Sequence, residues 1–131
     1  MKFAYTIVYV ASVPETLAFY EAAFGLTCRF LHESGQYGEL ETGSTVLAFA
    51  THEVAEANLG GHYKPVTVEG VVIGIELAFA TVDVVAAYHK AVSAGAAPLR
   101  PPANKPWGQT VAYVRSREGM LIELCTPMGG S

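Results

Sequence analysis

The sequence is poor in cysteine, in basic residues and in long apolar runs, and each shortage excludes a class of protein. Its two cysteines, Cys28 and Cys125, lie far apart in apolar stretches, so we expect free core thiols rather than a disulfide or a zinc site. No apolar run approaches the roughly 20 residues that span a bilayer. The first residues lack the charged and then apolar pattern of a secretion signal. We therefore expect a cytoplasmic protein with no membrane partner.

Basic residues are too few and too scattered to bind a nucleic acid backbone. Eight Lys and Arg stand against twelve Asp and Glu, which gives a formal net charge of -4 at pH 7. We therefore expect no nucleic acid partner. Apolar residues are abundant instead, at 51% of 131 residues, enough to bury one core without disulfides or metals. We predict a single domain over residues 1–131, with the small terminal residues 128–131 outside its fold.

The first part of the chain has the signals of a strand, a helix and three more strands. Residues 3–10 are β-branched and aromatic, as in a buried strand. Ser12 is a suitable N-cap, Pro14 suits a first helical turn, and Gly25 ends the apolar pattern of the helix between them. Glycine-rich turns then separate three predicted strands, at residues 27–33, 37–42 and 45–51.

The same order of signals returns after a stretch without clear periodicity. Residues 52–71 predict a linker or lid, because apolar positions are sparse there and loops of that length are usually functional or mobile. A strand at 75–80 and a helix at 82–94 follow, with Gly95 ending the helix. We expect Val84, Val85, Tyr88 and Val92 on its packing side. Three strands are predicted after it, at 97–100, 110–115 and 120–126, with a proline-rich separator after the first.

Aligning the two halves supports a duplication. The match pairs Tyr5 with Glu76, Val13 with Val84, Gly25 with Gly95, Tyr37-Gly38 with Trp107-Gly108, and residues 47–51 with 122–126. The predicted fold class is therefore α+β: two tandem βαβββ modules that form a curved sheet around a cleft, with helices on the outer faces. Module one covers about 3–51, the linker about 52–72 and module two about 73–126.

Strand alternation predicts which side chains face the cleft. If Thr6, Val8 and Val10 pack under the helix, the other face of the first strand presents Tyr5, Ile7 and Tyr9. The same parity in the other strands predicts a longer set: Val46, Ala48, Ala50, Glu76, Ala78, Ala80, Trp107, Gln109, Val111, Tyr113, Leu121, Glu123 and Cys125.

Two carboxylates, Glu76 and Glu123, fall in this otherwise apolar and aromatic set. They are candidates to bind a metal, to orient a ligand or to act as acid and base; alternatively, they are structural carboxylates satisfied by arginine or backbone groups. The aromatic residues are either core filler or a ligand surface that uses their polar ends. The four histidines, His32, His52, His62 and His89, are interpreted as surface residues.

The order of motifs resembles the glyoxalase/bleomycin-resistance (vicinal oxygen chelate) superfamily over residues 3–126. The motifs are Tyr9-Val10, Phe19-Tyr20-Glu21, Phe24-Gly25-Leu26, Glu76-Leu77-Ala78-Phe79, and the closing run from Glu118 to Leu124. Members include glyoxalase I, extradiol dioxygenases, fosfomycin-resistance enzymes and metal-free drug-binding proteins. The resemblance implies homodimerisation and, in metal-dependent members, four ligands from the first and last strand of each module.

Those four positions are Tyr5, Ala48, Glu76 and Glu123 in this sequence. Ala48 offers no donor atom, Tyr5 replaces a histidine with a phenol, and two carboxylates alone make a poor site for a first-row metal. We therefore expect no metal or other cofactor. The alternative is one divalent metal held by Glu76, Glu123 and water.

An apolar and aromatic cleft without a complete set of metal ligands is similar to that of the metal-free antibiotic-binding members. The leading hypothesis is a protein that sequesters an aromatic or polyketide-like antibiotic and so confers resistance. Its predicted ligand-binding residues are Tyr5, Tyr9, Glu76, Trp107, Gln109, Tyr113 and Glu123. The alternative is an enzyme, a lyase, isomerase or dioxygenase, that is metal-dependent or uses Glu76 or Glu123 as general base. A dimerising module without a ligand is a third hypothesis.

Overall fold

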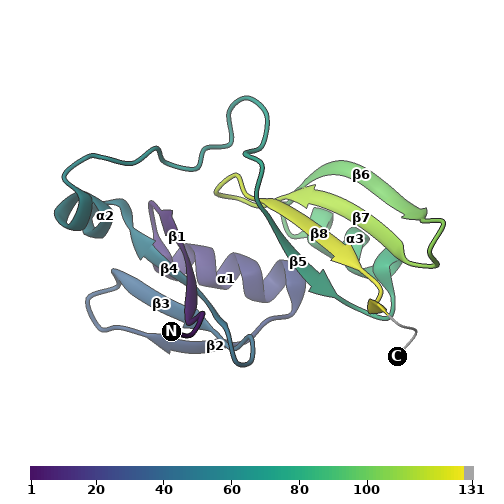
Figure 1. The fold of residues 1–131 in the computed structure, drawn as a ribbon, viewed down its shortest axis with the longest axis horizontal. Helices are drawn as coiled ribbons and strands as arrows, with labels where there is room; N and C mark the ends of the chain where they lie inside the picture. The colour runs from purple at the N-terminus through teal and green to yellow at the C-terminus, as the bar shows by residue number, and fades with distance from the viewer. Residues whose placement is uncertain (129–131) are drawn as a thin grey trace. The chain divides into compact units, whose positions relative to one another are not determined.

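The computed structural model describes residues 1–128; the terminal Gly129, Gly130 and Ser131, set apart in the sequence analysis, lie outside the described residues. The chain divides into two compact units, Met1–Val66 and Thr67–Ser131, called unit 1 and unit 2 below. Each unit holds one four-stranded sheet (Figure 1). The prediction of an α+β fold with two tandem modules is confirmed.

Unit 1 contains four strands and two helices. In chain order they are β1 (Tyr5–Val10), α1 (Val13–Phe24), β2 (Cys28–Leu31), β3 (Tyr37–Leu40), β4 (Val46–Thr51) and α2 (His52–Leu59). The strand order across the sheet is β1-β4-β3-β2, in which β1 runs parallel to β4 and the other neighbours are antiparallel. One face of the sheet is covered by α1, which leaves the other, here called the open face, without a helix (Figure 1).

Helix α1 begins and ends where the sequence predicts. Ser12 accepts a hydrogen bond from the backbone N–H of Glu15 at 3.3 Å, and Gly25 ends the helix in the left-handed conformation at φ 69°. Its buried residues include Leu17, which packs against β3 so closely that a Cβ added to Gly38 would lie 2.7 Å from the Leu17 Cδ1 atom. Glycine at position 38 is therefore what lets α1 lie directly on the sheet.

Unit 2 repeats this plan without a second helix. Its elements are β5 (Glu76–Ala80), α3 (Val84–Ser93), β6 (Ala97–Asn104), β7 (Thr110–Arg115) and β8 (Leu121–Cys125). The strand order is β5-β8-β7-β6, with β5 parallel to β8, so each strand has a counterpart in unit 1. Helix α3 packs on β6, β7 and β8. The predicted βαβββ repeat is confirmed, because the strands of the two sheets have the same order and run in the same directions.

Three details differ from the sequence prediction. Residues 52–71 are not a continuous loop, because their first eight residues form α2, capped by the Thr51 side chain. Strand β6 continues through the prolines to Asn104; it is an edge strand with two register shifts, where missing N–H donors are tolerated. On α3, Val84 and Ala91 are buried while Val85 is 51% exposed, so Val85 is not on the packing side.

The segment that opens unit 2 is held to the β7–β8 hairpin by Arg115. The guanidinium of Arg115 donates to the carbonyls of Gly119, Gly70 and Thr67, at 3.1, 2.7 and 2.5 Å. Gly119 has a φ of 111° and lies so close to Thr67 that a Cβ there would collide with the Thr67 carbonyl. Residues 67–70 of the predicted linker therefore pack as part of unit 2. Within residues 1–128, no helix has the length and apolar character to cross a membrane.

Candidate functional site

The open face of the unit 2 sheet brings together both carboxylates singled out from the sequence. In the register, Glu123 of β8 lies between Ala78 of β5 and Tyr113 of β7, and Glu76 lies two residues before Ala78 in β5, on the same face. The neighbours of Glu123 in its own strand, Ile122 and Leu124, are buried on the helix-covered face. The predicted placement on one face is confirmed for Glu76, Ala78, Ala80, Val111, Tyr113, Leu121, Glu123 and Cys125.

Glu123 is the centre of the polar contacts on this face. The Tyr113 hydroxyl donates to Glu123 Oε1 at 2.9 Å. Burial, and then the hydrogen bond with Glu123 and its negative charge, raise the pKa of Glu76. The hydrogen bond to Glu123 and then burial raise the pKa of Tyr113 to about 12. Burial, followed by the same carboxylates, raises the pKa of the Cys125 thiol. Every group around Glu123 thus holds its proton more tightly than usual.

No basic side chain offsets these carboxylates in the part of the chain that the structure describes. Arg115 shares the face, but its guanidinium donates to three backbone carbonyls. Neither Glu76 nor Glu123 has an ion pair among the described residues. The pair can therefore share a proton, accept hydrogen bonds from a ligand's hydroxyl or amine, or exchange a proton with it.

The open face of the unit 1 sheet is aromatic, and its predicted composition is also confirmed. Tyr5, Ile7 and Tyr9 of β1 pair with Val46, Ala48 and Ala50 of β4, while Val8 and Val10 are buried on the other side. The side chains of Tyr5 and Ile7 are 53% and 41% exposed, although Ala48 is fully buried. On this face the small residues of β4 are therefore buried, and the larger side chains of the neighbouring strand β1 are at least partly exposed beside them.

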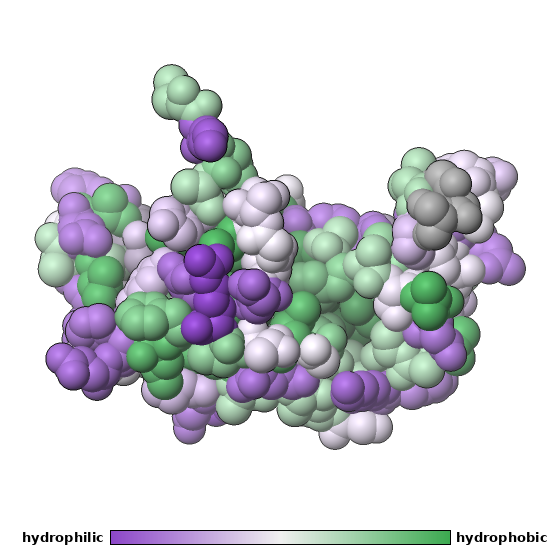
Figure 2. Space-filling view, turned by 90° about the horizontal axis from the view of Figure 1, so that it is seen from below, coloured by the Kyte–Doolittle hydropathy of each residue, from purple (hydrophilic) through white to green (hydrophobic). Residues whose placement is uncertain are grey.

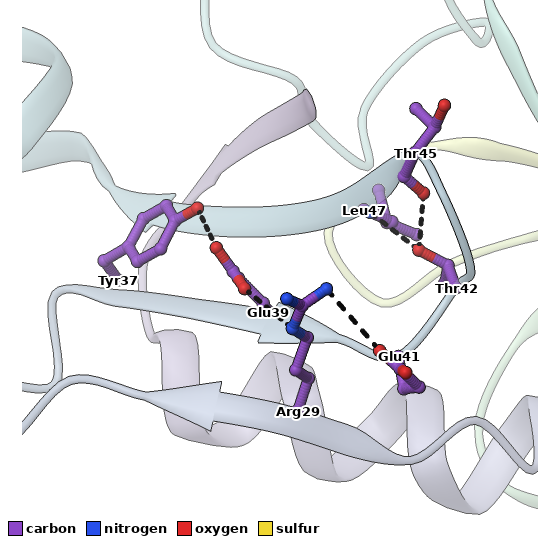
Figure 3. Close-up of polar contacts among 7 residues, drawn as sticks. All are labelled: Arg29, Tyr37, Glu39, Glu41, Thr42, Thr45 and Leu47. Carbon is purple, nitrogen blue, oxygen red and sulfur yellow. Dashed lines mark hydrogen bonds and ion pairs between the residues drawn. The ribbon is translucent and has the colours of Figure 1, made fainter. Parts of the chain in front are cut away.

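A charged network on this face was missed by the sequence analysis. The Tyr37 hydroxyl donates to Glu39 Oε2 at 2.7 Å, and the Arg29 guanidinium lies 3.6 Å from Glu39 and 3.7 Å from Glu41 (Figure 3). Burial and the hydrogen bond to Glu39 raise the pKa of Tyr37 above its ordinary range. The alternation of Tyr37, Glu39 and Glu41 was a usable signal for their shared face. No such signal in the sequence marked Arg29. A register shift between Cys28 and Phe30 interrupts the alternation of β2 there and brings the Arg29 side chain to Glu39 of β3.

Two predicted ligand-binding residues lie in a turn instead of a strand. Trp107 and Gln109 precede β7, in the hairpin that joins it to β6, so their expected position within the strand is wrong. The Trp107 indole N–H donates to Gln109 Oε1 at 2.8 Å, and Gln109 Nε2 donates to the Thr126 carbonyl at 2.8 Å. The Trp107 side chain is 63% exposed. These bonds hold an accessible indole at one end of the unit 2 sheet.

The sheet registers also correct one pair of the internal alignment. Tyr37 pairs with Ala50 in unit 1, and Val111 pairs with Cys125 in unit 2. Since Ala50 and Cys125 are equivalent, Tyr37 corresponds to Val111 and not to Trp107. The pairs Tyr5 with Glu76 and 47–51 with 122–126 agree with the registers.

The surface also carries apolar side chains outside these faces. Figure 2 shows hydrophobic surface interspersed with hydrophilic surface on the side it presents. These apolar side chains include Phe3, Val71, Ile75 and Val82, whereas the exposed Phe30 pairs with Glu39 and belongs to the open face of unit 1. Of the four histidines, His32, His62 and His89 are exposed as predicted, but His52 is half-buried and its ring contacts Tyr63.

Comparison with known proteins gives a family and a set of similar folds. The family model "Glyoxalase/Bleomycin resistance protein/Dioxygenase superfamily" matches residues 2–124. No curated protein matches the chain. Among solved structures, a glyoxalase-related enzyme from Fulvimarina pelagi is 19% identical with a TM-score of 0.80, over 97% of this chain and 88% of that one.

Two further structures cover nearly the whole of both chains. A protein of unknown function from Agrobacterium tumefaciens is 23% identical with a TM-score of 0.77, over 98% of this chain and 95% of that one. TioX from Micromonospora sp. ML1 is 19% identical with a TM-score of 0.70, over 96% and 98% of the two chains. At these identities the likeness concerns the fold.

Proposed function

Because the chain belongs to the glyoxalase/bleomycin resistance protein/dioxygenase superfamily, we propose that it is a metal-free protein that sequesters an aromatic or polyketide-like antibiotic. Such a protein needs an accessible surface that stacks on a planar molecule and polar groups that orient it. It needs no catalytic step, since resistance follows from lowering the free drug concentration. The superfamily's description covers binding proteins and enzymes, so the choice between them rests on the side chains.

The first support for a metal-free role is the identity of the residues at the four positions that bind the metal in metal-dependent members. Of the four positions that hold a metal in related proteins, Ala48 has no donor atom and is fully buried, and Tyr5 is a largely exposed phenol. The other two, Glu76 and Glu123, are hydrogen-bonded to each other, and the pKa of Glu76 is raised, so a proton competes with a cation there. Among residues 1–128 no three histidine, cysteine or acidic side chains are grouped to hold a metal. These residues do not fit a divalent metal.

The aromatic surface is the second support, and it carries the proposal. Tyr5 on the unit 1 sheet and Trp107 at one end of the unit 2 sheet are 53% and 63% exposed, so each ring is accessible to a planar ligand. Each stacked aromatic pair contributes about 0.5–1.5 kcal/mol beyond the burial of apolar area. A planar drug that stacks on either ring and also buries apolar area on the adjoining sheet would bind in about the micromolar range.

Fluorescence titration tests the proposal directly, because Trp107 is the only tryptophan in the sequence. A panel of planar aromatic antibiotics should include compounds that change Trp107 emission saturably and raise the melting temperature. Tyr113→Ala, on the unit 2 sheet that follows Trp107, should weaken binding, whereas Tyr88→Ala, a control on helix α3, should leave affinity unchanged. A panel that neither alters emission nor shifts melting would remove the main support. About one equivalent of metal in protein purified without chelator would contradict the metal-free role.

A second candidate function rests on one specific observation. The raised pKa of Glu76, beside the Glu123 carboxylate, is the kind of shift that acid–base catalysts require. An isomerase or lyase could use the pair to move a proton. Mass spectrometry of bound compounds after long incubation distinguishes the two functions, because a binding protein returns its ligand unchanged. Conversion that Glu76→Gln abolishes would favour the enzyme.

We further propose that the protein is a cytoplasmic homodimer. Both cysteines are free and half-buried, which accords with a reducing compartment. Exposed apolar side chains such as Phe3 and Phe30 would be covered by a partner subunit. Sedimentation equilibrium should give twice the chain mass of 13.9 kDa. A monomer mass at micromolar concentration would contradict this proposal.

A further inference from the structure

Unit 1 contains a hollow that the proposed function does not use. It lies beside α2, has a volume of about 540 Å³, and is lined by His52, Glu53, Glu56, Ala57 and Tyr63. The hollow is shallow and largely open to solvent, so a small molecule would lie against its wall rather than be enclosed. All of its lining comes from one short stretch of the chain.

Two consecutive glycines build the hollow. Helix α2 ends at Gly60, and Gly60 and Gly61 both have left-handed backbones, at φ 61° and 82°, which reverse the chain. Tyr63 then returns against His52, where its hydroxyl lies 3.1 Å from His52 Nδ1 and the two rings are nearly parallel, 6.2 Å apart at 21°. A Cβ at Gly61 would lie 3.2 Å from Glu56 Oε1. The turn thus brings the Tyr63 ring and the Glu56 carboxylate into the lining of the same hollow.

The Tyr63 ring is held in place by neighbouring side chains. The Tyr63 ring also contacts the ring of Tyr9 on β1, with centroids 5.6 Å apart. A ring that contacts Tyr9 and is held at its hydroxyl edge by the His52 hydrogen bond needs little ordering when a ligand arrives. The face of a tyrosine ring carries negative potential and attracts cations.

The charge of the hollow is negative. Glu53 and Glu56 are exposed, and neither has an ion pair among residues 1–128. Lys64 follows Tyr63 but does not line the hollow. The two carboxylates and His52 are not grouped as metal ligands in the described chain. Exposed carboxylates that share a hollow with an aromatic ring suit a bulky cation with diffuse charge better than a small metal ion, which requires convergent donors.

We propose that this hollow binds a small organic ammonium ion, with its alkylated nitrogen on the ring of Tyr63 and its charge facing Glu53 and Glu56. The site belongs to unit 1 alone and is independent of the antibiotic-binding role. Recognition uses the cation–π attraction of Tyr63 for the ammonium and the carboxylates for its charge.

Choline and its uncharged isostere 3,3-dimethylbutan-1-ol test the proposal as a matched pair on the full chain. Titrations followed by backbone amide NMR should give saturable shifts confined to residues 52–63 with choline, and at least about 5-fold weaker binding of the isostere. Glu56→Gln should weaken choline binding about 2-fold, as expected for an exposed charge pair. Glu33→Gln, a carboxylate in the β2–β3 turn, should change nothing.

Substitutions of Tyr63 separate the ring from the hydroxyl. Tyr63→Leu should weaken choline binding about 2- to 5-fold, the range for an exposed cation–π contact. Tyr63→Phe keeps the ring and should retain most of the affinity even if Tyr63→Leu fails to fold. Tyr88→Leu, at the other tyrosine–histidine ring contact, is the matched control. Equal binding of choline and the isostere, stronger binding of calcium at the same ionic strength, or loss of binding in Glu33→Gln would overturn the proposal.

Discussion

Replacing Glu76 with glutamine is expected to stabilise the protein at neutral pH. The pKa of Glu76 is raised by burial and by Glu123, so the folded state binds its proton more tightly than the unfolded chain, whose value is near 4.5. The contribution of this carboxyl to stability is therefore fully present below pH 4.5 and is lost as the pH rises through the folded pKa. A glutamine keeps the shape and has no charge to lose.

The size of the effect is limited by solvent. Glu76 is only partly desolvated and stays largely in contact with water, which screens its repulsion from Glu123, so the gain should stay within about 1 kcal/mol. For a chain of this size that corresponds to about 2–5 °C in melting temperature. The matched variant is Glu39→Gln on the unit 1 sheet, where the carboxylate is paired with Arg29 and accepts from Tyr37. Loss of the Glu39 carboxylate should lower the free energy of unfolding at pH 7.

Thermal unfolding followed by circular dichroism, in steps from pH 4 to pH 8, measures both variants. The melting curves of Glu76→Gln and the wild-type protein should coincide at pH 4 and separate as the pH rises, with the variant more stable. A variant that is less stable at pH 8, or a difference that does not depend on pH, would refute the reasoning. The first result would mean that the carboxylate has a favourable partner, and the second that only packing has changed.

Three substitutions test the packing of the two units. Gly38→Ala should destabilise the protein by about 1–3 kcal/mol in urea unfolding, because the new Cβ would lie 2.7 Å from Leu17 under α1. Gly119→Ala should cost at least as much, since it combines a φ of 111° with a collision against the backbone of segment 67–70; an unchanged midpoint would contradict that contact. Arg115→Met should speed amide exchange and proteolysis in segment 67–70, and protection equal to the wild type would mean that its hydrogen bonds are dispensable.

The sequence correctly predicted those features of the fold that depend only on a residue and its near neighbours in the chain. Ser12 caps α1 and Gly25 ends it, because a side-chain oxygen and a left-handed glycine act on the nearest backbone groups. Strand alternation placed Glu76 and Glu123 on one face, since the side-chain period of a strand is two. The repeat of both signals made the duplicated βαβββ fold predictable.

Elements with weak apolar patterns were not predictable in the same way. Helix α2 buries only Ala55, so its residues lack the apolar stripe that marks a packed helix, although Thr51 was available as a cap. Strand β6 contains prolines that argue against a strand until its position at the sheet edge is known. The strand at 110–115 was predicted with its observed bounds, but its alternation was extended back to Trp107 and Gln109, which lie in the turn before it, where a period of two does not apply.

The sequence by itself determined the two modules, the caps of α1 and the parity of their strands, because these depend on neighbours within a few residues. Tertiary structure alone decided the surroundings of the charged groups. A register shift in β2 places Arg29 beside Glu39, whereas no described cation forms an ion pair with Glu76 or Glu123. Charge pairing depends on distances across strands that are remote in the chain, and a shift of one residue reverses which side chains meet.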